Sequence, residues 1–588
     1  MCSELEKIEF ARRMDVINMG PCLVRKDRTV LLDCSHPEFE AARDRLPMFA
    51  ELVKSPPLYH TYRITPLSLW NAAALGASAD GIAECLELLS GRGLPSGLSE
   101  EIKLLMSRYG RLTLYSADGE ERLLLRGDSE ELLNEPEVAA AAAACGFHRT
   151  GPVEMTGNAA RRGMLKQELA GAGYPVLDSA GYHEGEALDI SWKEGDDSFE
   201  LRDYQREAAE RFEAIGGSGI IVLPCGAGKT IVGLAVLEAS NYETLILTSN
   251  ATSVRQWTEE LKMRTNLAPE SIGEYTGERR QVRPVTVATY QMLTHRVAKG
   301  DGFKHMGLFN ERNWGLIIYD EVHLLPAPVF RATAEIQATR RLGLTATLVR
   351  EDGREGDVFS LIGPKIYDCP WKTLERRGWI AAVQCLEVPV PMEPELKKRY
   401  LYGTAKEKFR LASANPVKAE IAVKIIKAHK GASILVIGQY LDQLTELAAI
   451  VGAPVITGKT PQKERLKLYN AFNEGILPVL VVSKVANFAV NLPDASVAIE
   501  VSGAFGSRQE EAQRLGRVLR PKQGDNRAFF YTLVTEDSRE QEFALRRRLF
   551  LTEQGYEYTV MPKFCEESEI RFEEPECENP HKEEASGS

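Results

Sequence analysis

The stretch LPCGAGKT, Leu223–Thr230, lies between the β-branched run GIIV and the helix-forming run TIVGLAVLEA. Backbone N–H groups in a Gly-rich turn between a strand and a helix can bind a phosphate, and the helix N-terminus adds partial positive charge. The usual phosphate-binding loop reads G-x-x-x-x-G-K-[ST], and this chain has Leu223 where that pattern has its first glycine. We still predict a phosphate-binding loop, because Gly226 and Gly228 permit the tight turn.

The residues of this loop have distinct expected roles. Pro224 fixes φ where the chain enters the turn. Lys229 is expected to reach the β- and γ-phosphates of a nucleotide, and Thr230 to offer its hydroxyl to Mg²⁺. The expected nucleotide-binding residues of the loop are Pro224, Cys225, Gly226, Ala227, Gly228, Lys229 and Thr230.

A second segment, WGLIIYDEVH (Trp314–His323), places two carboxylates directly after an apolar run. Asp320 can hold Mg²⁺ at the end of the predicted strand, mostly through water. Glu321 can act as the general base that polarises the attacking water. A lone Asp-Glu pair after a strand can also be only an acidic turn. With a phosphate-binding loop earlier in the chain, the pair instead predicts binding and hydrolysis of a nucleoside triphosphate.

Short apolar runs alternate with amphipathic helical stretches from about residue 199 onward. The runs include GIIVLP, ETLILTSN, VTVATY and RLGLTAT, and the same texture returns after about residue 381 with SILVIG, PVLVVS and ASVAIEVSG. This alternation is typical of β-α units on a parallel sheet. We predict an α/β protein with two tandem parallel-sheet domains, preceded by an N-terminal region that mixes helices and strands.

The composition excludes few functions, but it indicates the compartment in which the protein acts. The net charge of −12 gives no sign of nucleic-acid binding, but the tail from Glu566 onward holds nine Glu against two cations, so the body is nearly neutral and can carry basic grooves. The ten Cys include no C-x-x-C pair, which favours the reducing cytosol over a disulfide framework or a zinc site. Without a signal peptide or an apolar run of ~18–20 residues, we expect a cytoplasmic protein with no membrane association.

Several motifs resemble those of superfamily 2 helicases. The segment DEVH after IIY is similar to their motif II, and LRDYQ (Leu201–Gln205) resembles the adenine-recognising Q motif. That resemblance implies a base contact by Gln205, with Arg202 beside it. Three further segments resemble motif Ia, the following strand-contacting motif and motif III: TSNATSVRQW (Thr248–Trp257), ATYQ (Ala288–Gln291) and TAT (Thr345–Thr347).

The segment QRLGRVLR, Gln513–Arg520, resembles motif VI of these helicases. The resemblance implies that Arg517 and Arg520 are arginine fingers and that Gln513 acts with them on the nucleotide. The two motor domains of the family are RecA-like, and their cofactors are ATP and Mg²⁺. The fingers lie on the second domain, so they would reach the phosphates only when the cleft between the domains closes.

Finer details resemble the XPB branch, the xeroderma pigmentosum group B helicases. Arg350, Glu351 and Asp352 follow TAT closely, as the RED motif does in that branch. The segments Lys54–Gly76 and Ser483–Lys522 are similar to bacterial XPB proteins, and the resemblance runs from about residue 20 to 565. It implies a 3′-5′ DNA helicase that acts in nucleotide excision repair, with a nuclease partner by family analogy.

The XPB resemblance also implies two accessory elements. A damage-recognition region would lie at about Gly146–Trp192. A thumb-like insertion would carry the basic residues Lys397, Lys398, Arg399, Lys406, Lys408 and Arg410. A charge run alone is more often a solvated helix face, but beside a DNA track it would contact phosphates. In motif V the family usually has an acidic residue where this chain has Asn491, which leaves the coupling between the motor domains open.

Residues that couple nucleotide state to DNA are also implied by the resemblance. We expect His323 to hydrogen-bond Thr345 or Thr347, with Arg350, Glu351 and Asp352 in the same coupling region. The expected phosphate contacts on DNA are Thr248, Arg255, Thr289, Thr457, Lys459, Ser483 and Lys484. Each of the threonines could equally be a strand-end cap. Phosphate contacts of this kind carry no sequence information.

The expected domain organisation has five parts: an N-terminal helicase-associated domain (1–135), a damage-recognition-like region with linker (136–198), a RecA-like ATP-binding domain (199–380), a RecA-like C-terminal domain (381–565) and an acidic tail (566–588). Four alternatives stay open: a duplex DNA translocase or ATPase switch with little unwinding, an RNA helicase, a restriction-type motor subunit, and a non-catalytic DNA-binding scaffold. The last is disfavoured by the full set of predicted catalytic residues.

Overall fold

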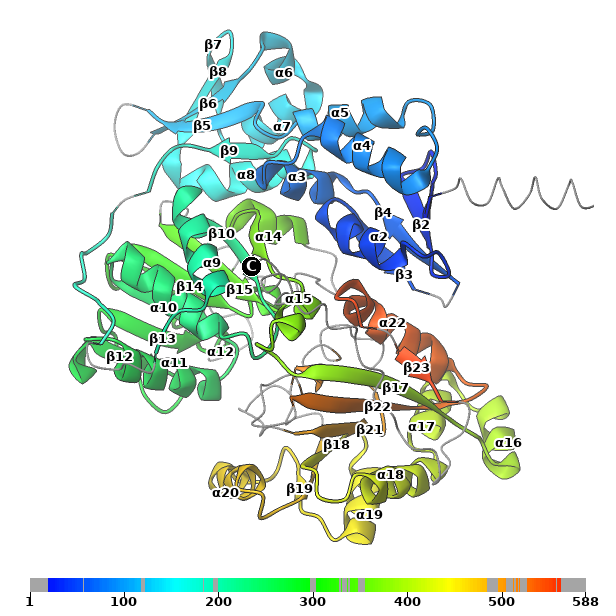
Figure 1. The fold of residues 1–588 in the computed structure, drawn as a ribbon. Coiled ribbons are helices and arrows are strands. Elements are labelled where there is room, and N and C mark those ends of the chain that lie inside the picture. Colours follow the sequence, from blue (N-terminus) through cyan, green and yellow to red (C-terminus); the bar gives the residue numbers. More distant parts are fainter. Residues whose placement is uncertain are drawn as a thin grey trace, which may run out of the picture.

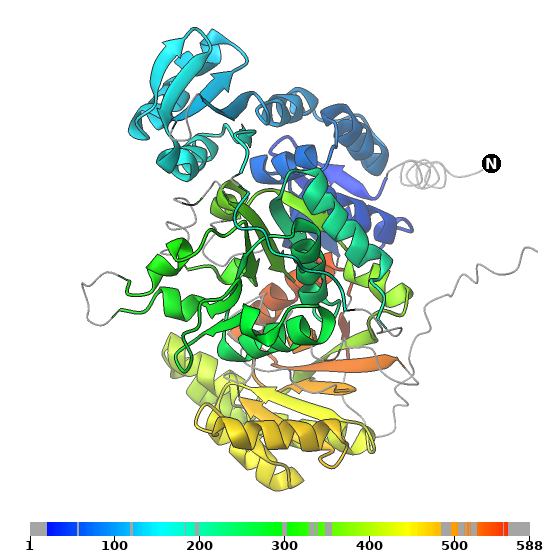
Figure 2. The same cartoon turned by 90° about the vertical axis from the view of Figure 1, so that its left-hand side faces the viewer.

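The computed structural model describes residues 20–55, 58–117, 122–182, 184–193, 199–296, 303–326, 339–346, 355–483, 495–503, 526–556 and 558–561, with positions 329, 336, 511, 514–516 and 518. Two N-terminal units lie above two parallel-sheet domains (Figure 1; Figure 2 shows the same molecule from the side). In the part of the chain that the structure describes, no helix is long and apolar enough to span a bilayer.

The first α/β domain is built on a seven-stranded, wholly parallel sheet. Its order is β12 (Ile272–Tyr275), β13 (Val285–Thr289), β11 (Thr244–Thr248), β14 (Leu316–Asp320), β15 (Arg340–Thr345), β10 (Ser218–Val222) and β16 (Lys365–Asp368). The helices of this domain are α9 (Asp203–Ala214), α10 (Lys229–Ser240), α11 (Ala251–Arg264), α12 (Tyr290–Leu293), α14 (Glu355–Leu361) and α15 (Trp371–Arg376). Strands buried on both faces explain the continuous apolar runs of the sequence.

The second α/β domain repeats this architecture. Its sheet is also seven-stranded and parallel, in the order β19 (Val455–Ile456), β20 (Val479–Ser483), β18 (Ile434–Gly438), β21 (Val497–Glu500), β22 (Arg527–Thr535), β17 (Ala382–Val390) and β23 (Tyr558–Val560). Its helices are α16 (Pro394–Tyr402), α17 (Ala405–Ser413), α18 (Val417–Ala428), α19 (Leu441–Val451), α20 (Gln462–Asn473) and α22 (Arg539–Glu553). The prediction of two tandem parallel-sheet domains is therefore confirmed.

The N-terminal region forms two mixed α/β units. The first has the antiparallel sheet β1 (Cys22–Val24), β2 (Thr29–Asp33), β4 (Tyr59–Arg63) and β3 (Glu51–Lys54), with helices α2 (Phe39–Arg45), α3 (Pro66–Ala74), α4 (Ala79–Ser90) and α5 (Leu98–Ser107). The second has the sheet β7 (His148–Gly151), β8 (Glu154–Asn158), β6 (Arg122–Gly127), β5 (Leu112–Ser116) and β9 (Val176–Asp178), with α6 (Glu130–Asn134), α7 (Pro136–Ala144) and α8 (Arg162–Gly171).

The boundary expected between residues 135 and 136 falls inside this second unit. Strands β5 and β6 lie before it and β8 lies after it, yet Leu124 of β6 pairs with Thr156 of β8 in one sheet. Strand β5 also pairs in parallel with β9, more than fifty residues later in the chain. The second unit therefore begins near Leu112, and it contains only part of the region expected to recognise damage.

The first N-terminal unit contacts both α/β domains. The backbone N–H of Lys365 in β16 donates to Asn71 Oδ1 at 3.0 Å. The backbone N–H of Leu52 in β3 donates to Glu553 Oε1 of α22 at 2.8 Å, and Leu549 of α22 packs into the unit's apolar core. The N-terminal unit thus bridges the two sheets.

Candidate nucleotide-binding site

The phosphate-binding loop accommodates Leu223 because this residue extends strand β10. Its backbone N–H donates to Thr345 O of β15 at 3.0 Å, and its side chain is fully buried. The turn comes later, where Gly226 and Gly228 have φ values of +85° and +79°. A Cβ on Gly228 would lie 2.6 Å from Gln205 Nε2, so this position needs glycine for space as well as for φ. Helix α10 begins at the next residue, Lys229.

The Q-motif segment holds this loop through the carbonyl oxygen of Ala227. Gln205 Nε2 donates to Ala227 O at 3.0 Å, and Tyr204 OH donates to the same oxygen at 2.8 Å. Gln205 Oε1 accepts from the backbone N–H of Arg202 at 3.1 Å, and the Arg202 guanidinium lies 4.4 Å from the Trp379 ring centroid. In this conformation the Gln205 amide is 4% exposed and braces the loop. The expected base contact by Gln205 stays a prediction.

Lys229 lies against the predicted general base. Its Nζ is 3.1 Å from Glu321 Oε1, and the two side chains are 12% and 20% exposed. Burial opposes a charge on Lys229, but Glu321, Cys225 and Asp320 outweigh it, so the pKa of Lys229 is raised above its ordinary value. Glu321 adopts the left-handed backbone conformation at φ 52°, which is strained for a side chain of this size. The ammonium group and the carboxylate therefore sit together at the loop.

Asp320 is held by two aromatic side chains that the motif analysis did not assign. Trp257 Nε1 of α11 donates to Asp320 Oδ2 at 3.0 Å, and Tyr290 OH donates to Asp320 O at 2.9 Å. Burial and then the charge of Glu321 raise the pKa of Asp320 to about 6. Trp257 is 1% exposed, and a buried indole N–H needs an acceptor, which is the signal that could have found this contact.

We expect Trp257→Phe to lower the rate of nucleotide hydrolysis about tenfold or more, because a buried carboxylate that loses its donor also loses its fixed orientation. A matched control is Trp314→Phe. Trp314 is 2% exposed in the same domain, and its Nε1 donates to Leu308 O at 3.0 Å. Steady-state kinetics and thermal unfolding of both variants check this. Equal rate losses in the two variants would mean that Trp257 only fills space.

The residues expected to bind Mg²⁺ fit that ion in chemistry. Thr230 lies in the first turn of α10, and Asp320 ends β14, so both are at the edge where the parallel strands end. A hydroxyl and a carboxylate are oxygen ligands, which Mg²⁺ prefers, with water completing its shell. Among the described residues, no group of three or more His, Cys, Asp or Glu could hold a metal by itself.

The coupling contact predicted for His323 is present. His323 lies in the short 3₁₀ turn after Glu321, and its Nδ1 is 2.7 Å from Thr345 Oγ1. Both side chains are buried. Since Thr345 O also accepts from Leu223, strand β15 joins the carboxylate segment to the phosphate-binding loop. Four further coupling residues lie outside the described residues: Thr347, Arg350, Glu351 and Asp352.

Three of the residues expected to contact DNA are buried. Thr248 is fully buried, and its Oγ1 donates to Asn250 O at 3.2 Å. Thr289 is 5% exposed and caps the N-terminus of α12. Ser483 is 2% exposed. The hydroxyls of both threonines already bond to the backbone, and Thr289 has the strand-end cap role.

The remaining expected DNA contacts are accessible where they are described. Arg255 on α11 is 41% exposed and lies 3.6 Å from Glu278. Lys459 is exposed, and Thr457 Oγ1 accepts from its backbone N–H at 3.2 Å. The basic residues expected to form a thumb-like insertion lie on α16 and α17, where Lys397, Lys398 and Arg410 pair with exposed carboxylates. Lys484 and three motif VI residues lie outside the described residues: Gln513, Arg517 and Arg520.

Comparison with protein families matches three parts of the chain. Residues 374–584 match the family described as ERCC3/RAD25/XPB C-terminal helicase. Residues 198–350 match the type III restriction enzyme res subunit, and residues 22–151 match a helicase conserved C-terminal domain.

Whole-length relatives agree with the match to the ERCC3/RAD25/XPB family. The chain is 50% identical over 542 residues to the DNA 3′-5′ helicase XPB of Kineococcus radiotolerans, covering 92% of this chain and 96% of that protein. It is also 50% identical over 544 residues to the DNA 3′-5′ helicase XPB of Mycobacterium tuberculosis, covering 92% and 97%. The XPB/SSL2 helicase/translocase subunit of general transcription and DNA repair factor IIH in Saccharomyces cerevisiae is 33% identical over 602 residues, covering 91% and 71%. This chain therefore belongs to the XPB family of DNA 3′-5′ helicases.

Proposed function

We propose that this protein uses ATP and Mg²⁺ to move on DNA and open it in the 3′-5′ direction, in nucleotide excision repair. The main support for the proposal is the group of charged side chains beside the phosphate-binding loop. Lys229 Nζ lies 3.1 Å from Glu321 Oε1, next to the buried Asp320. A scaffold that only bound DNA would need neither a charged lysine nor a held carboxylate at this edge of the sheet.

The first domain supplies the ground-state contacts of hydrolysis. Backbone N–H groups of the loop and the N-terminus of α10 bind phosphate oxygens, and Lys229 leaves Glu321 to neutralise the β- and γ-phosphates. Glu321 then orients the attacking water in line with the γ-phosphate and accepts its proton. Thr230 and Asp320 would hold Mg²⁺, which would neutralise negative charge on the phosphate oxygens.

The second domain supplies the arginines that complete the site. Arg517 and Arg520 follow β21 in the chain and so belong to the second domain's part of the sequence. A positive charge that arrives only on closure makes hydrolysis conditional on the domain movement, and an arginine finger can be worth about 10³–10⁵ in rate. Closure and reopening of the cleft would then move the two domains, each of which holds the DNA, along one DNA strand.

The proposed DNA contacts are the accessible ones, Arg255, Thr457 and Lys459, with α16 and α17 reaching the duplex. Contacts of these types go to phosphates, so binding should weaken with salt and depend little on sequence. We also propose a nuclease partner, by analogy with the family. We further propose a cytoplasmic location, because free cysteines such as Cys22 and Cys225 are typical of a reducing compartment.

The test is ATP turnover with and without DNA. We expect single-stranded or forked DNA to raise the rate severalfold over the basal value, RNA to raise it much less, and chelation of Mg²⁺ to abolish it. Displacement of a strand from a duplex with a 3′ tail, measured beside triplex displacement, separates unwinding from translocation alone. An ATPase that ignores DNA would contradict the proposal.

A further inference from the structure

Four buried charged side chains meet where the second domain begins its motif VI segment. Glu500 ends strand β21, Arg514 belongs to the motif VI segment (Gln513–Arg520), Glu511 lies two residues before that segment, and Arg547 lies on α22. The side chains of Glu500 and Arg514 are 0% exposed, and those of Arg547 and Glu511 are 1% and 2% exposed. Two carboxylates and two guanidinium groups therefore share one enclosed site.

Their contacts form a chain that joins three elements. Arg514 Nη1 donates to Glu500 Oε1. Arg547 Nε lies 3.7 Å from the same oxygen and 3.2 Å from Glu511 Oε2. Tyr558 OH of β23 donates to Glu511 Oε1 at 3.0 Å. The motif VI segment is thus tied to the core of its domain through Arg514, and the chain just before this segment is tied to the core through Glu511.

The electrostatics show which carboxylate holds the arginines. Burial opposes a charge on Glu500, but Arg547 and Arg514 outweigh it and lower its pKa below the ordinary value. Burial and then the charge of Glu500 raise the pKa of Glu511 to about 8. The charged form of Glu500 is therefore favoured, and both guanidinium groups lie within 4 Å of it.

The backbone at Gly503 packs against the Arg547 guanidinium of this cluster. A Cβ on Gly503 would lie 2.2 Å from Arg547 Cζ, so the guanidinium packs directly on the backbone at that glycine. Gly503 is the last described residue before Glu511. Arg547 thus contacts the backbone at Gly503 on one side and Glu511, just before motif VI, on the other.

Stability alone does not account for such a cluster. Charges removed from water lose hydration, and apolar side chains of similar volume are often as stabilising as a buried ion pair or more so. Ion pairs do, however, prescribe direction and distance, which apolar contacts do not.

We propose that Glu500, acting with Arg547, is a positioning residue for the arginine fingers. Glu500 fixes Arg514, which precedes Arg517 by three residues in the sequence. This inference rests on the proposed ATPase function and adds a residue that touches no nucleotide. Misplacing a finger by about 1 Å can cost about 10²-fold in rate. A residue that anchors the chain three positions from the finger should therefore affect the rate of hydrolysis.

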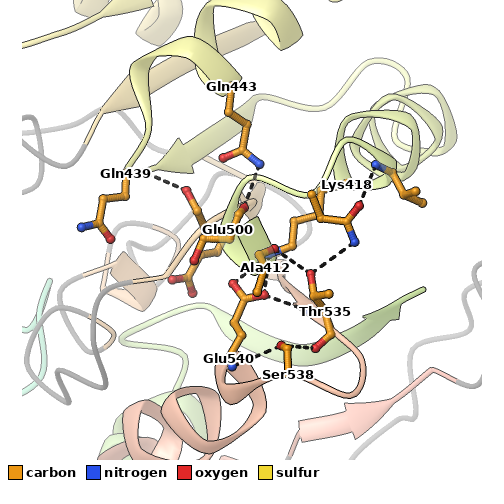
Figure 3. Close-up of polar contacts among 12 residues, drawn as sticks. Ala412, Lys418, Gln439, Gln443, Glu500, Thr535, Ser538 and Glu540 are labelled. Carbon is orange, nitrogen blue, oxygen red and sulfur yellow. Dashed lines mark hydrogen bonds and ion pairs between the residues drawn. The ribbon is translucent and has the colours of Figure 1, made fainter. Parts of the chain in front are cut away.

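A second buried ion pair in the same domain provides a matched control. Lys418 Nζ of α18 lies 2.7 Å from Glu540 Oε1, with side chains 0% and 1% exposed. Figure 3 shows this pair beside Glu500, with Glu540 also accepting from the backbone N–H of Thr535 at 3.0 Å. It ties α18 and α22 together through residues outside the motif VI segment.

The experiment compares two double variants of the full chain, Glu500→Gln/Arg514→Met and Lys418→Met/Glu540→Gln. The first removes the Arg514–Glu500 pair together with the Arg547–Glu500 contact, and the second removes the Lys418–Glu540 pair, all of them buried. We expect the first to lower kcat for ATP by at least about tenfold with KM and thermal midpoint nearly unchanged, because nucleotide binding resides on the first domain. We expect the second to keep the basal kcat.

The outcomes separate three conclusions. A wild-type chain without ATPase activity would refute the proposed function itself. An active wild type with an unchanged kcat in Glu500→Gln/Arg514→Met would overturn the positioning role. Parallel losses of kcat and thermal midpoint in both double variants would also overturn it, since they would reflect general loosening of the domain. The single variant Glu500→Asp, which keeps the charge, should recover part of the rate lost in Glu500→Gln.

Discussion

Glu321→Gln is expected to stop ATP turnover while leaving ATP affinity close to that of the wild type. Gln keeps the size of the side chain and an oxygen that can still accept from Lys229, which lies 3.1 Å away in the structure. It cannot take a proton from water, and loss of a general base costs about 10²–10⁴ in rate. Rapid-quench measurement of ATP hydrolysis, with affinity measured by calorimetry, checks both halves of this prediction.

Two comparisons make this result specific to Glu321. Glu270→Gln changes an exposed carboxylate of the same domain and should leave turnover unchanged. Lys229→Ala should lose ATP affinity as well as turnover, because the lysine binds the phosphates themselves. Normal turnover in Glu321→Gln would show that another group activates the water.

Arg517→Ala is expected to lower kcat about 10³-fold or more while changing ATP affinity far less. The phosphate-binding loop, Lys229 and the metal ligands all belong to the first domain, so binding does not need the second. The arginine acts on the charge that develops in the transition state, and a contact made only there affects kcat in preference to binding. Separate measurement of nucleotide affinity and single-turnover rate checks the split.

The control for this variant is Arg546→Ala, which removes an exposed arginine of α22 in the same domain. It should leave kcat and affinity unchanged. Equal loss of affinity and rate in Arg517→Ala would indicate that this arginine binds the ground state, and the gating mechanism would then be wrong.

The parallel sheets and the phosphate-binding loop were predictable because their signals are local. Strands such as β11 and β14 are buried almost throughout, so their residues read as unbroken apolar runs. The loop needs Gly226 and Gly228 for positive φ, which only a glycine adopts freely. Leu223 weakened the motif but not the fold, because it belongs to the strand and not to the turn.

The N-terminal units were harder to divide because their pairing is non-local. Nothing near Leu112 indicates that β5 will pair with β9 at Val176. The boundary expected at 135/136, which rested on the family resemblance, therefore cut a sheet that hydrogen bonds hold together. The expected boundaries of the two α/β domains carry no such conflict, since each of their sheets lies within its expected range.

Within the site, the roles of side chains that fit two functions equally well could not be predicted from the sequence. A threonine at a strand end has the same local pattern whether it caps a helix or binds a phosphate, and Thr289 caps α12. Trp257 follows the apolar spacing of an amphipathic helix, which hides its hydrogen bond to Asp320. His323 was predictable because its partner, Thr345, is the end of the neighbouring motif strand.

The most direct test of gated hydrolysis is a structure of the Glu321→Gln variant with ATP, Mg²⁺ and forked DNA bound. The substitution should hold the complex before cleavage. Our account predicts the two sheets closed over one nucleotide, with the Arg517 guanidinium about 3 Å from a γ-phosphate oxygen. A nucleotide bound by the first domain, with Arg517 and Arg520 both turned away from it while DNA is engaged, would contradict the account.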